Sequence, residues 1–136
     1  MCGIIGFTGK LEAADILVGG LTQLEYRGYD SAGIAVSEGS STKIIKTAGK
    51  VSNLREKVES SEDRSGTCGI GHTRWATHGG VTTTNAHPHV AGKITLIHNG
   101  IIENYKEIAL ALKAQGRTPV SETDTEICLL YTSPSP

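Results

Sequence analysis

The sequence predicts a mixed domain of β-strands and α-helices, and two patterns support this prediction. In residues 12–26 and 103–115, apolar side chains recur at spacings of three and four, which is the period of an amphipathic helix. Short apolar runs that end in glycine or polar turns, such as residues 1–8 and 67–73, are typical of buried strands. The 136 residues suit one domain and leave little room for a second.

The predicted elements alternate along the chain, and each follows from a local pattern. The first helix carries apolar residues on one face, although Gly19 and Gly20 weaken its middle. Two short strands flank a polar turn at residues 38–41, and Gly116 ends a later helix. The predicted strands are residues 1–8, 34–37, 43–47, 67–73 and 93–99. The predicted helices are residues 12–26, 52–60 and 103–115, with a last one that begins near Asp124.

Two segments fall outside this alternation. Residues 74–88 are rich in Gly, Thr, His and Asn and have no apolar period, and loops this long are usually functional lids or disordered. Near the end, Pro134 and Pro136 cannot continue a helix, so we expect residues 128–136 to break the one that begins near Asp124. We assign residues 1–127 to a partial domain and expect residues 128–136 to be a non-native or truncated tail.

Charge and composition argue against several classes of protein. The formal net charge is −1 with no basic stripe, so we expect no nucleic-acid partner and no anionic membrane surface. No apolar run is long enough to span a bilayer, and no signal segment precedes the first strand, which favours the cytoplasm. The three cysteines form no regular framework, and the five histidines lack standard ligand spacing, so we expect no metal.

Cys2 is the sharpest chemical feature of the sequence. Removal of Met1 leaves a thiol and a free α-amine on one residue. Reference pKa values are about 7.7–8.0 for such an amine and about 8.5 for a thiol, so the amine can take the thiol proton near neutral pH. The alternative, a buried cysteine that only packs in a strand, stays open from the spacing alone.

Polar groups in three later segments fit the binding of a charged substrate. In residues 72–79, Arg74 can hold a carboxylate through two parallel hydrogen bonds while Trp75 shields the site from water. The pair Asn99 and Gly100 is either a turn or two hydrogen-bond donors for an oxyanion, with each donor contributing about 2.7–4 kcal/mol. Asp124 either caps a helix or holds an ammonium group.

Six segments in order resemble the N-terminal glutaminase domain of the glutamine–fructose-6-phosphate aminotransferases (isomerizing). These enzymes belong to the class II glutamine amidotransferases, which are N-terminal-nucleophile hydrolases. The resemblance covers residues 1–127. The segments are CGIIG (2–6), RGYDSAG (27–33), HTRWATHG (72–79), NAHPH (85–89), HNGIIEN (98–104) and SETDTE (121–126).

The resemblance implies a fold and a role for each matching residue. The implied fold is α+β, a four-layer αββα sandwich that is incomplete at its C-terminal end. Cys2 is the implied nucleophile, its own α-amine is the general base, and Asn99 with Gly100 forms the oxyanion hole. The implied glutamine-binding positions are Arg74 and Thr77 for the α-carboxylate, Asp124 for the α-amine, Trp75 and His78 on a closing loop, and Arg27 near the nucleophile.

The reaction implied by the resemblance is hydrolysis of L-glutamine to glutamate and ammonia through a γ-glutamyl thioester on Cys2, with no cofactor. In the family, a separate domain uses the ammonia to convert fructose 6-phosphate to glucosamine 6-phosphate. That domain is absent from these 136 residues, and the full-length enzyme is expected to be a homodimer. L-glutamine is therefore the expected ligand of this chain, with no nucleic-acid or membrane partner.

Three alternatives remain open. The chain could belong to another class II amidotransferase, of the phosphoribosyl diphosphate, asparagine synthetase or glutamate synthase type. It could be a non-catalytic binding module with an incidental cysteine, or an inactive truncated fragment. Tyr29 in the second segment and the string HTRWATHG (72–79) favour the sugar-phosphate aminotransferases over the other amidotransferases.

Overall fold

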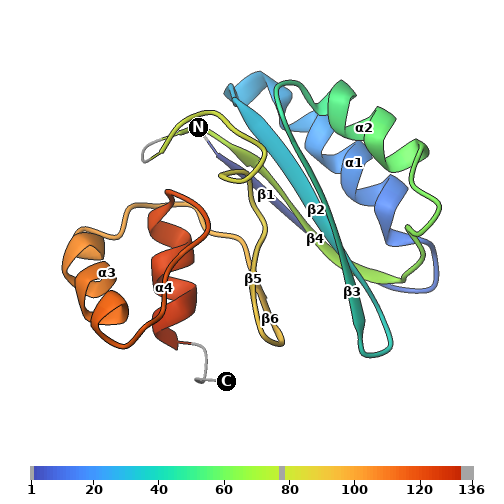
Figure 1. Cartoon of the computed structure of the whole chain (residues 1–136). Coiled ribbons are helices and arrows are strands. Elements are labelled where there is room, and N and C mark those ends of the chain that lie inside the picture. The colour runs from blue at the N-terminus through green and yellow to red at the C-terminus, as the bar shows by residue number, and fades with distance from the viewer. Residues whose placement is uncertain (1, 77–78, 133–136) are drawn as a thin grey trace.

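The computed structural model describes residues 2–76 and 79–132, and its elements lie in successive layers (Figure 1). Helices α1 (Ala13–Gln23) and α2 (Val51–Glu59) form the first layer and cover one face of a four-stranded sheet. The strands of this sheet are β1 (Gly3–Thr8), β2 (Ser31–Glu38), β3 (Ser41–Ala48) and β4 (Cys68–Arg74). The predicted strands at 34–37 and 43–47 thus lie within longer ones, β2 and β3.

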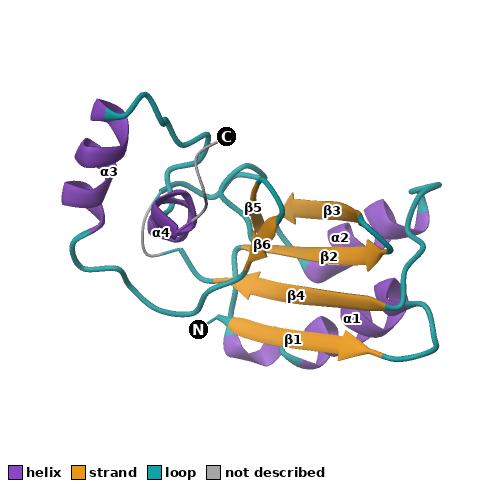
Figure 2. Cartoon of the chain, turned by 90° about the horizontal axis from the view of Figure 1, so that it is seen from below, coloured by secondary structure: helices purple, strands orange, loops and turns teal. Residues whose placement is uncertain are grey.

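The order of the strands brings three chain segments to one end of this sheet. The order is β1-β4-β2-β3, and neighbouring strands are antiparallel, as Figure 2 shows. Gly3 at the start of β1 pairs with Thr73, and Ser31 at the start of β2 pairs with Arg74 at the end of β4. The residues that precede β1 and β2 therefore lie beside the residues that follow β4.

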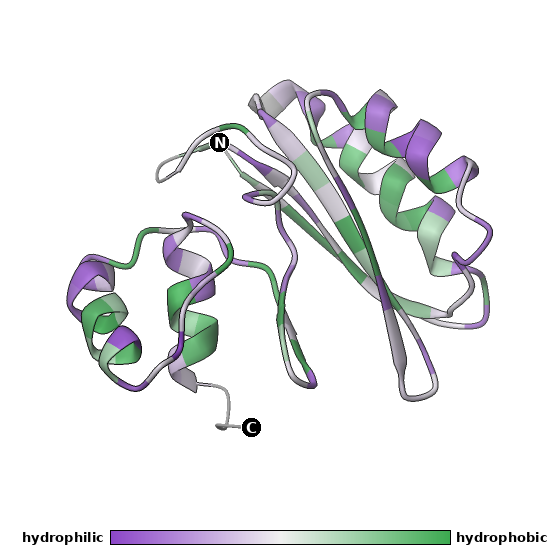
Figure 3. Ribbon diagram, viewed as in Figure 1, coloured by the Kyte–Doolittle hydropathy of each residue, from purple (hydrophilic) through white to green (hydrophobic). Residues whose placement is uncertain are grey.

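The main core lies between α1, α2 and the sheet. Leu17, Leu21, Ile34 and Leu54 are fully buried there, and Figure 3 shows hydrophobic colour along α1 and more hydrophilic colour on α2. The double glycine does not interrupt α1. At Gly20 a Cβ would lie only 1.8 Å from the Cδ1 of Ile5, so the glycine allows α1 to pack closely on β1. This closer packing offsets the helix propensity that a glycine loses relative to alanine.

The remaining elements form two further layers. β5 (His89–Ala91) and β6 (Ile94–Leu96) pair as a short antiparallel hairpin. Helices α3 (Tyr105–Ala114) and α4 (Asp124–Thr132) pack together beyond it (Figure 1). The predicted strand at 93–99 ends early, because the chain leaves the hairpin after Leu96. The helix, sheet, sheet, helix order matches the predicted four-layer sandwich.

The last helix runs further than the sequence predicted. We expected residues 128–136 to break it, but α4 continues to Thr132, and Leu129 is fully buried. Cys128 to Leu130 carry no helix breaker, and burying Leu129 stabilises the extra turn. The prolines fall in residues 133–136, outside the described residues. The assignment of residues 128–136 as a non-native tail stays a prediction. In the part of the chain that the structure describes, no helix is long and apolar enough to cross a membrane.

Candidate active site

Cys2 lies immediately before β1, at the end of the sheet where β4 finishes. Its side chain is half-buried, and the Trp75 backbone N–H donates to the Cys2 Sγ at 3.1 Å. The next residue is fixed in place because the Gly3 N–H donates to the Thr73 Oγ1 at 3.0 Å. A Cβ on Gly3 would lie 2.8 Å from both that oxygen and Leu24, so only glycine fits there. The thiol is thus held at a defined position beside the residue that follows β4.

Asn99 reaches the same position from the segment after β6. Its Nδ2 donates to the carbonyl oxygen of Cys2 at 3.2 Å, and its Oδ1 lies 2.8 Å from the Nε2 of His72. Gly100 follows with a φ of +149°, in the region that favours glycine. One of the two predicted oxyanion donors, the Asn99 amide, therefore lies next to the backbone of the predicted nucleophile, although 97 positions separate the two residues in sequence.

Arg74 ends β4 and is 3% exposed. Its Nη1 donates to the carbonyl of Gly80 at 2.9 Å, and its Nη2 donates to that of Gly79 at 3.5 Å. The Asp30 carboxylate lies 3.8 Å from the Nη1 and also accepts a hydrogen bond from the Ala76 N–H at 2.5 Å. Asp30 therefore orients both the guanidinium and the backbone after β4. We assigned no role to this residue from the sequence, although it lies in the segment RGYDSAG (27–33).

Asp124 is the first residue of α4 and is 4% exposed. Its Oδ2 accepts a hydrogen bond from the Ile102 N–H at 2.8 Å, and its Oδ1 accepts one from the Thr125 N–H at 3.0 Å. Asp124 thus lies one residue inside the helix, and the capping side chain is Thr123 instead, because its Oγ1 accepts a hydrogen bond from the Glu126 N–H at 3.3 Å. A carboxylate in the first turn of a helix is still favoured by the helix dipole. The contact with Ile102 also ties α4 to the segment that carries Asn99 and Gly100.

Asn85 links the loop after β4 to the start of α4. Its Nδ2 donates to the Gly80 carbonyl at 3.0 Å and to the Glu122 Oε1 at 3.1 Å. The Glu122 N–H donates back to the Asn85 Oδ1 at 2.8 Å, and Asn85 is 1% exposed. Because the carbonyl of Gly80 also accepts from Arg74, this amide connects the two predicted substrate-binding regions. The segment NAHPH (85–89) was the only sequence signal for it.

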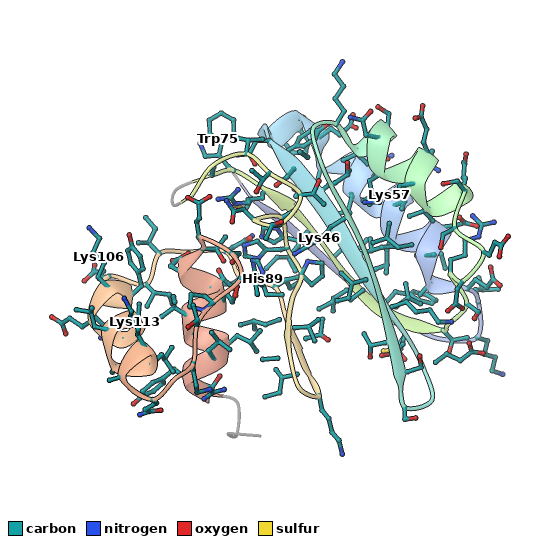
Figure 4. The ribbon with its side chains drawn as sticks, in the orientation of Figure 1. Lys46, Lys57, Trp75, His89, Lys106 and Lys113 are labelled. Carbon is teal, nitrogen blue, oxygen red and sulfur yellow. The ribbon has the colours of Figure 1, made fainter. Side chains whose placement is uncertain are left out.

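The other predicted site residues are placed less completely. Trp75 is 54% exposed and its ring lies over Gly28, pointing away from the sheet in Figure 4. Arg27 ends the short 3-10 helix η1 (Glu25–Arg27), and its side chain is not among the described ones. Thr77 and His78 lie outside the described residues.

Three buried histidines pack against one another between the two sheets. The rings of His72 and His87 stack with their centroids 4.1 Å apart, and the ring of His89 meets His87 edge-on at 4.7 Å. Burial lowers the pKa of His72 to about 4 and that of His89 to about 3, and it lowers the pKa of His87 even further. Within the described residues, no group of side chains has the arrangement of a metal site.

Lys46 supports the loop that carries His87 and leads into His89. Its ammonium donates to the carbonyls of Thr84, Ala86 and Pro88 at 3.1, 2.8 and 3.3 Å, and Figure 4 shows it close to His89. Burial lowers the pKa of this lysine. A Cβ on Gly33 would lie 1.9 Å from the His87 carbonyl oxygen, so the loop packs directly against β2.

The fold and this arrangement define the class of protein. The structure superposes on the glutamine phosphoribosylpyrophosphate amidotransferase from B. subtilis with a TM-score of 0.79, at 26% identity over 96% of this chain and 28% of that one. A second match, an allosteric regulatory enzyme of purine biosynthesis, has a TM-score of 0.81 at 28% identity, covering 95% of this chain and 28% of that one. Both structures share the fold of this chain over nearly its whole length, and the first is a glutamine amidotransferase by name, so the predicted α+β fold is confirmed.

Residues 53–133 match the family model of the glutamine amidotransferase domain. The chain belongs to this family. It is 56% identical over 129 residues to the glutamine–fructose-6-phosphate aminotransferase (isomerizing) of Thermus thermophilus. The aligned region covers 93% of this chain and 21% of the relative. The relatives of that name from Caulobacter vibrioides and Clostridium tetani are each 54% identical over the same shares. The chain thus spans about a fifth of the length of these relatives, and the predicted family resemblance is confirmed.

Proposed function

We propose that this chain hydrolyses L-glutamine to glutamate and ammonia, with Cys2 as the nucleophile and Asn99 and Gly100 as the oxyanion hole. One observation carries the proposal: the Asn99 amide donates to the Cys2 carbonyl at 3.2 Å, beside the half-buried thiol. A hydrogen-bond donor beside a nucleophile is the arrangement that acyl transfer needs. The proposed class of enzyme is therefore a glutaminase of the N-terminal-nucleophile type.

The proposed reaction needs no group outside the chain except water. After removal of Met1, the α-amine of Cys2 takes the thiol proton, and the thiolate forms a C–S bond to the side-chain amide carbon of glutamine. Asn99 and Gly100 donate to the resulting oxyanion. The C–N bond then breaks, and the α-amine returns the proton to the departing ammonia. Water, deprotonated by the same amine, cleaves the thioester and releases glutamate.

We propose that Arg74 and Asp124 hold the two charged ends of glutamine. Each Asp124 oxygen accepts one backbone hydrogen bond and has a second lone pair for a substrate ammonium. Arg74 donates to Gly79 and Gly80 here, and an incoming carboxylate would replace these carbonyls with a stronger charge-assisted pair. The roles of Arg27, Trp75, Thr77 and His78 in this pocket also remain proposals.

The names of the most similar relatives extend the proposal to the longer protein. We propose that the ammonia is passed to a sugar-phosphate domain that converts fructose 6-phosphate to glucosamine 6-phosphate, in a homodimeric enzyme. This choice is supported by relatives with that name at 54–56% identity, against 26% for the glutamine phosphoribosylpyrophosphate amidotransferase.

The direct test is glutamate production by the purified 136-residue chain. We expect L-glutamine to yield glutamate and ammonia in equal amounts, measured with a glutamate dehydrogenase assay. The Cys68→Ala variant is the matched control, because Cys68 is exposed on the far end of β4 and should not affect turnover. Folded chain with Met1 removed that releases no glutamate would contradict the proposal.

The Gly100→Ala substitution should lower kcat by at least about 10-fold, because it displaces an oxyanion donor. At a φ of +149° an added Cβ would lie 2.9 Å from the His98 ring, so the backbone has to move. Gly92→Ala is the matched control: it has a φ of +57° in the β5–β6 turn and nothing within 4 Å. Steady-state kinetics of both variants decide the prediction, and an equal, small effect of both would refute it.

The Arg74→Lys substitution should raise the KM for glutamine by about 10-fold or more, because lysine keeps the charge but loses the two-pronged donor geometry. The ammonium would still face Asp30, so the buried negative charge is not left alone. Arg55→Lys, on the exposed side of α2, is the control and should leave KM unchanged. An unchanged KM in the Arg74 variant would show that this residue does not hold the substrate.

A further inference from the structure

We infer that His72 is a positioning residue that fixes the orientation of the Asn99 side-chain amide. The inference deepens the proposed function, on which it rests, because it concerns the group that we assign to the oxyanion hole. His72 lies in the middle of the pairing of β1, β4 and β2, opposite Ile4 on one side and Gly33 on the other. It is fully buried, and its ring nitrogen faces the Asn99 side chain.

The hydrogen bonds of the His72 ring define its tautomer. Its Nε2 lies 3.1 Å from the backbone carbonyl oxygen of His98 and 2.8 Å from the Asn99 Oδ1. A carbonyl oxygen can only accept a hydrogen bond, so the Nε2 must carry the proton. This conclusion does not depend on which way the Asn99 amide points.

The tautomer in turn determines the orientation of Asn99. With a proton on the Nε2 of His72, the Asn99 atom facing it must be the acceptor oxygen. The amide nitrogen then points the other way, where it lies 3.2 Å from the Cys2 carbonyl oxygen. A flipped amide would place N–H groups against the histidine N–H and present an oxygen to the oxyanion, which would repel it.

The surroundings of His72 keep this arrangement fixed. Its ring is stacked on that of His87 with an interplanar angle of 15°, and its backbone is bound on both sides within the sheet. Burial lowers its pKa to about 4, so the ring stays neutral and has one proton arrangement near neutral pH. Its Nδ1 has no hydrogen-bond partner among the described residues, so nothing there favours the other tautomer.

A double-mutant cycle tests the inference. His72→Met removes the donor and keeps an apolar side chain of similar size. We expect it to lower kcat by about 10-fold or more with little change in KM for glutamine. In an Asn99→Ala background the same substitution should change kcat by less than about 2-fold, because the group it positions is gone. His72→Gln, which can place an amide N–H near the same site, should recover much of the lost kcat.

The control and the contrary outcomes separate positioning from a purely structural role. His89 belongs to the same buried cluster but bonds to Thr123, so the loss caused by His89→Gln should multiply with that of Asn99→Ala. An equal loss from His72→Met in both backgrounds would overturn the inference. If the unaltered chain releases no glutamate, the proposed function fails, and the ¹⁵N spectrum of His72 decides separately. An Nε2–H tautomer supports the inference, and an Nδ1–H tautomer overturns it.

Discussion

Replacing Cys2 with alanine should reduce the rate of glutamate release by about 10⁴-fold or more, the scale seen when a covalent nucleophile is removed. The substitution takes away the sulfur that, in the proposed mechanism, forms the thioester. Asn99 contacts Cys2 through its backbone carbonyl, and this bond is kept in the variant, whereas the bond from the Trp75 N–H to the sulfur is lost. We expect the fold to survive. Steady-state assays and circular dichroism on the same samples measure both consequences.

The other two cysteines provide matched controls for this result. Cys68 is exposed at the start of β4, and Cys128 is half-buried on α4. The Cys68→Ala and Cys128→Ala variants should keep most of the activity. If all three cysteine variants lost activity to the same extent, loss of folding rather than loss of the nucleophile would explain the effect, and Cys2 would have no special role.

Lowering the pH from 7 to 5 should reduce the free energy of unfolding by up to about 6 kcal/mol, because three histidines are buried in neutral form. The pKa of His72 is lowered to about 4 and that of His89 to about 3, mainly by burial, and that of His87 is lowered by burial as well. Below about pH 6.5 the unfolded chain takes up protons that the folded chain does not. The contribution of each neutral histidine to the free energy of unfolding is therefore complete above about pH 6.5. It falls as the pH decreases, by about 2 kcal/mol per histidine at pH 5.

Urea unfolding at several pH values measures this dependence. Between pH 6 and 5, the slope of the free energy of unfolding against pH should correspond to the uptake of nearly three protons on unfolding. The His87→Leu substitution should reduce this number by about one. His87 is a suitable site because its Nδ1 makes no hydrogen bond to the described residues. Replacing it with leucine therefore breaks no hydrogen bond of that atom. The positive charges of Arg74 and Lys46 near the cluster also lower these pKa values, by less than burial does. A flat profile from pH 7 to 5 would contradict the burial described here.

The sequence predicted the helices and strands whose apolar periodicity lies within a single segment. The strands around residues 1–8 and 67–73 and the helix around residues 12–26 appear as β1, β4 and α1. The short strand β5 was missed, because three residues after the His87–Pro88 bond carry no period. The end of α4 was misplaced because the prolines lie further along the chain than the helix reaches, while Leu129 gains from burial.

The site itself could be predicted only through family resemblance, because its contacts join distant segments. Asn99 meets Cys2 across 97 positions, and Asp30 meets the Ala76 N–H across 46. No spacing rule within one helix or strand links such residues. Asp30, Asn85 and His72 were therefore missed as supporting residues, although each lies in a segment that resembles the family.

The central claim is that the Cys2 thiol attacks a carbon held in a glutamine pocket, and covalent labelling tests it most directly. The chain would be treated with the glutamine analogue 6-diazo-5-oxo-L-norleucine, and peptide mass spectrometry would locate the adduct. We predict one adduct, on Cys2 of chains that have lost Met1, and slower labelling when L-glutamine is added. Equal labelling of Cys2, Cys68 and Cys128, with no protection by glutamine, would contradict the account.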